Sequence, residues 1–161
     1  MNALKKALDV AVDKEQYEVA AKLRDELNAF SLDDEVAVLQ ANTAFYDAFT
    51  SGDLAVMEEL WVSEMEDAAV CTHPGFSHIR GHAAIIDSWR EIFRDSKMKI
   101  TPDNVHCTML RGGLSAVVTC TERVGTGDGE NALTATNVFE KGGDGRWRMV
   151  LHQAGPVVQS G

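Results

Sequence analysis

The sequence predicts an α+β fold in which helices pack on a curved antiparallel sheet, and three observations support this prediction. Apolar residues recur at helical spacing up to about residue 93. From residue 97 onward the period changes to two, which is the period of half-buried strands. Clusters of Gly and Asp separate four alternating segments, as is typical of β-hairpins. Helices followed by a strand meander form an α+β domain, and a curved sheet wrapped around them would leave a conical cavity.

The bulk composition indicates one folded domain with a short appendage. The chain has 161 residues, of which 45% are hydrophobic and 25% charged. The net charge is −10, and between Arg24 and Arg80 there are twelve carboxylates but no Lys or Arg. Duplex and anionic-membrane binders need clustered cations, so this charge pattern argues against nucleic-acid and membrane partners.

Cysteine and histidine usage gives no sign of a metal site. Cys71, Cys107 and Cys120 form no CxxC pair, which indicates reduced thiols in an intracellular protein. His73, His78 and His82 follow no accepted zinc spacing. We therefore expect neither a metal nor a cofactor. No apolar run reaches the roughly 20 residues of a membrane span, and no signal peptide is visible.

Residues 1–30 are predicted to form a helical hairpin that is a unit of its own. Apolar residues are spaced for one helix face before and after a polar turn at 13–16. Two such short helices cannot form a core by themselves. Their apolar stripe must therefore contact the main domain, a second copy of the chain or another protein. The residues expected to bind a partner are Leu4, Leu8, Tyr17, Leu23 and Leu27.

The second helix of this hairpin resembles the UVR motif of the UvrB and UvrC repair proteins. The resemblance rests on the run from Tyr17 to Leu27, YEVAAKLRDEL, preceded by Ala11, Val12 and Glu15. It implies a protein–protein contact element and not a nuclease or a DNA reader. A plain amphipathic hairpin that merely packs on its neighbour is the alternative.

Residues 31–161 are predicted to form the main domain. Ser31 reads as a helix N-cap followed by an acidic first turn. A long helix should then run to Gly52, and a shorter one should begin at Asp53. A strand is expected at 69–73, and a third helix carries its apolar face between Ile85 and Phe93. Four strands should follow at 104–111, 114–124, 132–141 and 146–157.

This order resembles the nuclear transport factor 2-like superfamily, in particular its SnoaL-like branch. The matching segments are AFYxAFxxGD from Ala44, CTHPG from Cys71, GxxxIxxSW from Gly81, TNVF from Thr136 and WRMVxHQAGP from Trp147. The resemblance implies a cone-shaped α+β barrel with three helices on the sheet and a homodimer formed through that sheet. Superfamily members include isomerases, dehydratases and cyclases, and also non-catalytic adaptors and hub domains. The pairing with a UVR-like hairpin resembles proteins of photosynthetic organisms, which implies a chloroplast stroma location after loss of a transit peptide, or otherwise the cytoplasm.

The cavity of such a cone would be lined by residues from several segments. His73 ends a strand before Pro74 and Gly75, so it should lie at or brace the mouth, and it is the candidate base. Glu122 beside Arg123 reads as a solvated rim group. Strand alternation allows at most one of His152 and Gln153 to face inward. The expected cavity residues are Tyr46, Trp61, His73, Trp89, Cys120, Asn137 and Gln153.

Two functions remain open from the sequence. The first is a protein-interaction or small-ligand-binding domain without evident catalysis, because no Asp or Glu is recognised inside an apolar strand run. The second is a small isomerase, cyclase or dehydratase that acts on an apolar carbonyl compound. In that case His73 would be the base, with Asn137 or Tyr46 polarising the oxygen.

Overall fold

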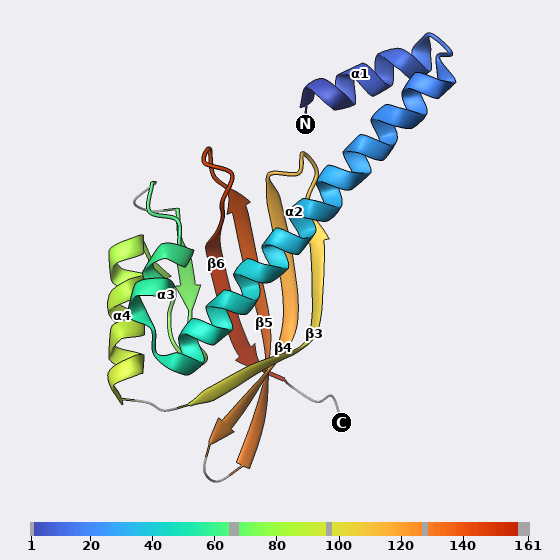
Figure 1. Ribbon diagram of the computed structural model, residues 1–161. Helices are drawn as coiled ribbons and strands as arrows, with labels where there is room; N and C mark the ends of the chain where they lie inside the picture. The colour runs from blue at the N-terminus through green and yellow to red at the C-terminus, as the bar shows by residue number, and fades with distance from the viewer. Residues whose placement is uncertain (1, 65–67, 96–97, 127–128, 158–161) are drawn as a thin grey trace.

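The computed structural model of the protein describes residues 2–64, 68–95, 98–126 and 129–157. A long helix and two shorter ones lie against one face of a curved sheet, and a helical hairpin extends away from it (Figure 1). The cone-shaped α+β arrangement predicted from the sequence is therefore confirmed. The elements differ from the prediction in one helix boundary and in the composition of the sheet.

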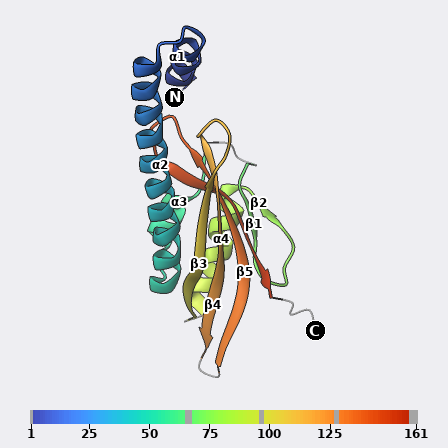
Figure 2. The same ribbon diagram turned by 90° about the vertical axis from the view of Figure 1, so that its right-hand side faces the viewer.

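The hairpin consists of α1 (Asn2–Asp13) and the first part of α2 (Tyr17–Ser51). The turn between them contains Glu15, whose φ of 56° lies in the left-handed region. Both views show the hairpin projecting beyond the sheet (Figures 1 and 2). No helix in the described ranges is long and apolar enough to cross a membrane.

The helix start predicted at Ser31 is wrong, because α2 runs without interruption through this position. Serine and aspartate are weak helix formers, but they cost only tenths of a kcal/mol each inside a helix. Neither Gly nor Pro occurs between residues 17 and 51 to end the helix. A single 35-residue helix therefore belongs to both the hairpin and the cone.

The two remaining helices follow the prediction. Gly52 ends α2 in the left-handed conformation, with φ of 68°. Asp53 caps α3 (Leu54–Leu60) by accepting a hydrogen bond from the backbone N–H of Val56 at 3.1 Å. The helix α4 (His82–Asp95) buries Ile85, Ile86 and Trp89 on one face. These helices therefore position one wall of the cone.

The sheet has six strands in the order β2-β1-β6-β5-β4-β3. Strands β3 (Lys99–Met109), β4 (Ser115–Thr126), β5 (Gly129–Lys141) and β6 (Trp147–Pro156) form the predicted antiparallel meander. The short strand β1 (Val70–Thr72) is parallel to β6 and antiparallel to β2 (Ile79–Arg80), so the sheet is mixed and not wholly antiparallel. In the Gly- and Asp-rich turn predicted at 125–129, residues 127 and 128 lie outside the described residues.

The core lies between the helices and the concave face of the sheet. Trp61, which follows α3, is buried and forms a bridge with Met149 of β6. Phe45 of α2 packs edge-on against Trp89 of α4, with 5.6 Å between ring centroids. The largest fully buried side chains in the described residues are Trp61, Trp89, Phe45, Phe139, Met57, Ile85 and Met149.

Candidate functional site

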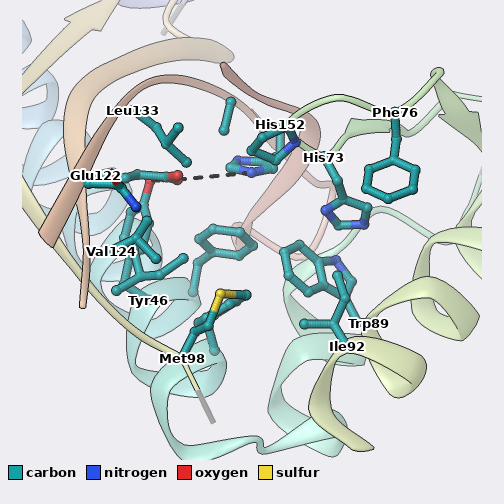
Figure 3. Close-up of a pocket in the computed structure, with 16 residues that line it drawn as sticks. Tyr46, His73, Phe76, Trp89, Ile92, Met98, Glu122, Val124, Leu133 and His152 are labelled. Atoms are coloured by element: carbon teal, nitrogen blue, oxygen red, sulfur yellow. Dashed lines mark hydrogen bonds and ion pairs between the residues drawn. The ribbon is translucent and has the colours of Figure 1, made fainter. Parts of the chain in front are cut away.

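A cavity of about 360 Å³ opens between α2, α4 and the concave face of the sheet (Figure 3). Its walls are mostly apolar, and its polar side chains come from α2, β4, β5, β6 and the segment after β1. Cavities of this size and character hold small molecules in many proteins. The lining residues are Phe45, Tyr46, Phe49, His73, Pro74, Phe76, Trp89, Ile92, Met98, Ile100, Glu122, Val124, Asn131, Leu133, His152 and Ala154.

Glu122 of β4 is buried in this wall, with 3% of its surface exposed. Along β4 the inward positions are Val118, Cys120, Glu122 and Val124, whereas Arg123 faces outward and pairs with Asp103 at 2.9 Å. The interpretation of Glu122 as a solvated rim group is therefore wrong. Alternation along the strand places it inside, and its neighbour in sequence belongs to the other face.

The environment of Glu122 is suited to proton transfer. Burial raises the pKa of its carboxyl to about 7 from the usual 4.5, because the apolar walls penalise the charged form. The hydroxyl of Tyr46 donates a hydrogen bond to Oε1 at 2.8 Å, which opposes part of that shift. A carboxyl with a pKa near neutrality exchanges protons readily at physiological pH.

His152 of β6 is the second inward polar group, and its tautomer follows from its partner. Its Nδ1 lies 2.6 Å from Oδ1 of Asn137, and an amide oxygen can only accept. The hydrogen must therefore be on Nδ1. Burial, and to a smaller extent His73, lowers the pKa of His152 to about 3, so the ring is neutral at physiological pH. Its bare Nε2 faces Glu122 Oε1 at 4.0 Å, too far for a hydrogen bond.

Asn137 of β5 supports these groups from behind the cavity wall. Its Nδ2 donates to Oδ1 of Asn42 at 2.8 Å and to the Tyr46 oxygen at 3.2 Å. The Sγ of Cys120 lies 3.2 Å from the same phenolic oxygen. Burial, with the nearby Glu122 carboxyl, raises the pKa of Tyr46 far above its usual range, so its hydroxyl stays a donor to Glu122.

His73 lies at the other end of the cavity, directly after β1. It is half-buried, and its ring packs edge-on against Trp89 with 4.7 Å between centroids. Burial lowers the pKa of His73 below 6.5, which makes it a weaker base than a free histidine. Pro74 and Phe76 follow on the rim, and Phe76 is 73% exposed.

The predicted cavity residues are thus only partly brought together. Tyr46, His73 and Trp89 line the cavity. Cys120 and Asn137 are buried behind its wall as partners of Tyr46. Trp61 is buried in another part of the core and borders a separate surface hollow near α3. Gln153 is exposed on the outer face of the sheet.

Sequence reasoning did not select three polar lining groups, Glu122, Asn131 and His152, although signals for Glu122 and His152 were present. Glu122 has the same strand parity as Val118 and Cys120, which marks an inward position. His152 was recognised as one of two alternatives with Gln153, and the structure places His152 inward. Within the described ranges, no three potential metal ligands lie together.

The residues predicted to bind a partner lie on the hairpin. Leu4, Leu8, Leu23 and Leu27 are half-buried, whereas Tyr17 is 69% exposed. Other large apolar side chains of α1 and the first part of α2 are also exposed. These are Val10, Val12, Val19, Phe30, Leu32 and Val36.

Solved structures with the same fold give two informative similarities. A predicted dehydratase of the NTF2-like family from Streptomyces avermitilis is 33% identical, with a TM-score of 0.71, over 79% of this chain and 98% of that one. A predicted association domain of calcium/calmodulin-dependent protein kinase type II from Thiobacillus denitrificans is 29% identical, with a TM-score of 0.61, over 73% and 93% of the two chains.

A third structure shows the likeness at the level of the fold. The NTF2-like protein with a cystatin-like fold from Novosphingobium aromaticivorans is 21% identical, with a TM-score of 0.65, over 88% of this chain and 90% of that one.

Among proteins of curated function, none matches the chain. The UvrB/UvrC motif matches residues 1–32, and the SnoaL-like domain matches residues 38–159. The chain therefore belongs to the SnoaL-like family of the NTF2-like fold, and it carries a UVR motif at its N-terminus.

Proposed function

We propose that the cone is the active site of an acid–base enzyme, a dehydratase or an isomerase, that acts on a small apolar carbonyl compound. The observation that carries this proposal is the buried carboxyl of Glu122, held by Tyr46 in an apolar cavity. A carboxyl is costly to bury, and a buried carboxyl that faces an open cavity is a frequent mark of proton chemistry.

Glu122 would carry one proton through the reaction. Its carboxylate takes a proton from the carbon next to the substrate carbonyl, and the electron pair of the broken C–H bond moves into an enolate. The carboxylic acid then returns the proton. Return to another carbon of the conjugated system gives an isomer, whereas transfer to a β-hydroxyl breaks the C–O bond and releases water. Both outcomes balance without an oxidant or a reductant.

Glu122 is better suited to this role than His73, which the sequence had indicated as the base. Burial moves the pKa of Glu122 up to about 7 and the pKa of His73 down from 6.5. At neutral pH Glu122 is therefore present in both its acid and its base form, and His73 is a weak base. The hydrogen bond from Tyr46 fixes Oε1, so that Oε2 remains for the substrate.

The similarity to the Streptomyces avermitilis structure, a predicted dehydratase, supports the choice of reaction class. Charge points the same way, because the described residues that line the cavity include no Lys or Arg. A substrate carboxylate or phosphate would find no cationic partner there and would face Glu122. A neutral carbonyl compound fits this lining better.

Hydrogen–deuterium exchange tests the proposal without knowledge of the natural substrate. The protein in D₂O should accelerate exchange of the α-protons of 2-tetralone, an apolar ketone, as followed by proton NMR. Glu122→Gln should slow this exchange by about 10²-fold or more, the usual share of general acid–base catalysis. Glu140→Gln is the matched control, since Glu140 is exposed on the neighbouring strand β5. Equal exchange with Glu122→Gln and the parent protein would refute the role of Glu122.

A second candidate function is a binding scaffold whose hairpin docks a partner protein and whose sheet forms a homodimer. The exposed apolar side chains of the hairpin favour it, as does the match to the UvrB/UvrC motif. The similarity to a predicted kinase association domain also supports an assembly role. Leu8→Asp combined with Leu23→Asp would separate the two helices, so capture of a partner through the hairpin should be lost.

A further inference from the structure

We propose that Nδ1 of His73 is the acceptor for a hydroxyl group of the ligand, so that the cavity selects hydroxylated apolar molecules. This inference deepens the proposed function by naming a feature of its substrate, but its test measures binding only.

Ser88 of α4 fixes the tautomer of His73. The Ser88 hydroxyl donates to the backbone carbonyl of Ile85 at 2.7 Å, which uses its one hydrogen. Nε2 of His73 lies 3.0 Å from the same Ser88 oxygen. That oxygen can therefore only accept, and Nε2 must carry the ring hydrogen. Nδ1 of the neutral ring is left with a bare lone pair.

Cys71 does not satisfy this lone pair. Its sulfur lies 4.0 Å from Nδ1 and 3.9 Å from Nε2, so it is nearly equidistant from the two nitrogens and is aimed at neither. Both distances are also at the outer limit for a sulfur hydrogen bond. Figure 3 shows the His73 ring beside Trp89, with one ring nitrogen directed toward the interior of the cavity. An acceptor in this position needs a donor from water or from a ligand.

Apart from the exposed amide of Asn131, which can donate as well as accept, the other polar groups of the cavity leave few donors for a ligand to meet. The Tyr46 hydrogen is used on Glu122, and Nε2 of His152 carries no hydrogen. The indole N–H of Trp89 is buried below the cavity surface. The two histidines of the inner wall therefore offer acceptors, and the Glu122 carboxyl donates only in its acid form. A ligand that presents a donor complements this wall better than one that presents only a ketone or an ether oxygen.

A hydroxyl is the donor that this lining fits. Among the lining residues that the structure describes, an anion would find no cation, and a bound ammonium would find one carboxyl, that of Glu122. His73 lies away from Glu122, between Trp89 and the exposed Phe76, so a neutral donor suits its surroundings. If the proposed function holds, the substrate carries a hydroxyl as well as a carbonyl. That combination favours elimination of water over isomerisation.

The probe pair is 2-naphthol and 2-methoxynaphthalene, which differ in the donor but share the apolar body. Calorimetric titration should show about tenfold tighter binding of the naphthol, the usual worth of one neutral hydrogen bond. His73→Phe should abolish this ratio of the two affinities, whereas Glu122→Gln should preserve it. Equal affinities in the parent protein would overturn the proposal. So would a ratio that survives His73→Phe and disappears in Glu122→Gln, because the hydroxyl would then bind at Glu122.

A spectroscopic measurement on the unmodified protein tests the proposal without depending on the folding of a variant. In ¹⁵N-labelled protein the Nδ1 resonance of His73 should have the shift of an unprotonated nitrogen. It should move toward the protonated value when 2-naphthol is added, and it should stay in place with the ether. A protonated Nδ1 in the free protein would refute the tautomer. Neither experiment needs turnover, so failure of the exchange test at Glu122 and failure of this proposal are separate results.

Discussion

The cone and the hairpin differ in what covers their apolar side chains. In the cone, Phe45, Phe139 and Met57 are almost completely buried by the chain itself. Among the described residues of the hairpin, only Ala11 and Ala20 are buried, and Tyr17 and Val12 remain more than half exposed. Burial of apolar surface stabilises a fold at about 25 cal/mol per Å². The cone therefore supplies most of the folding free energy, and the hairpin contributes little of it.

The helix α2 shows this difference within a single element. Six of its seven buried residues lie between Val38 and Phe49, next to the sheet. Before Val38 only Ala20 is buried, by contact with α1. One helix thus joins a self-sufficient domain to a surface whose apolar side chains are left uncovered, and this division suggests separate roles for the two regions.

The largest expected effect comes from a substitution that destabilises the cone and leaves the hairpin intact. Phe139→Ala removes a fully buried ring that is not part of the cavity lining, and it should lower the free energy of unfolding by about 3–5 kcal/mol. Leu8→Asp with Leu23→Asp should reduce helix content by circular dichroism but leave the thermal midpoint of the cone nearly unchanged. Chemical denaturation of both variants measures the contrast.

A drop of many degrees in the hairpin variant would contradict this comparison. It would mean that the hairpin is part of the packed core, and the docking role would then fail. A small effect of Phe139→Ala would equally show that the cone is less tightly packed than its burial indicates.

A smaller expected effect is the pH dependence of the free energy of unfolding, which tests the comparison between the cone and the hairpin further. The folded state raises the pKa of Glu122 from 4.5 to about 7, so it binds the proton more tightly than the unfolded chain does. The stability due to this group is fully present below pH 4.5 and is lost as pH rises through about 7. At about 1.4 kcal/mol per pKa unit, the loss amounts to about 3 kcal/mol. Urea denaturation at several pH values should show it.

Glu122→Gln isolates this contribution, because its side chain is neutral at every pH. The difference in unfolding free energy between the parent protein and Glu122→Gln should change across the window from pH 4.5 to 7. Glu140→Gln, the same substitution at an exposed position of β5, is the matched control. A flat difference for Glu122→Gln would mean that the carboxyl is solvated in the folded protein.

Periodicity was enough to predict most of the fold. The apolar stripes located the helices, and the Gly and Asp clusters separated the strands of the meander. The break at Ser31 was wrong because a cap residue is a weak signal when no Gly or Pro ends the preceding helix. The parallel pairing of β1 with β6 depends on residues about 80 positions apart, such as Cys71 and His152, and local patterns do not encode it.

The site was less predictable because its groups come from segments that are far apart in sequence. Tyr46, Asn137 and Glu122 meet only after α2 packs on the sheet. Glu122 could have been found from strand parity, but the adjacent Arg123 suggested a solvated rim group. The structure shows that Arg123 pairs instead with Asp103 on the outer face. The tautomers of the two histidines depend on Asn137 and Ser88, and only the three-dimensional contacts reveal them.

The most direct test of the central claim is the ionisation of Glu122 itself. In protein labelled with ¹³C at the glutamate carboxyl, the resonance of Glu122 can be assigned by its loss in Glu122→Gln and then followed against pH. We expect a midpoint at about 7, because burial of the carboxyl outweighs the opposing hydrogen bond from Tyr46. A midpoint near 4.5 would show an ordinary solvated carboxyl and would contradict a proton-transferring site in the cone.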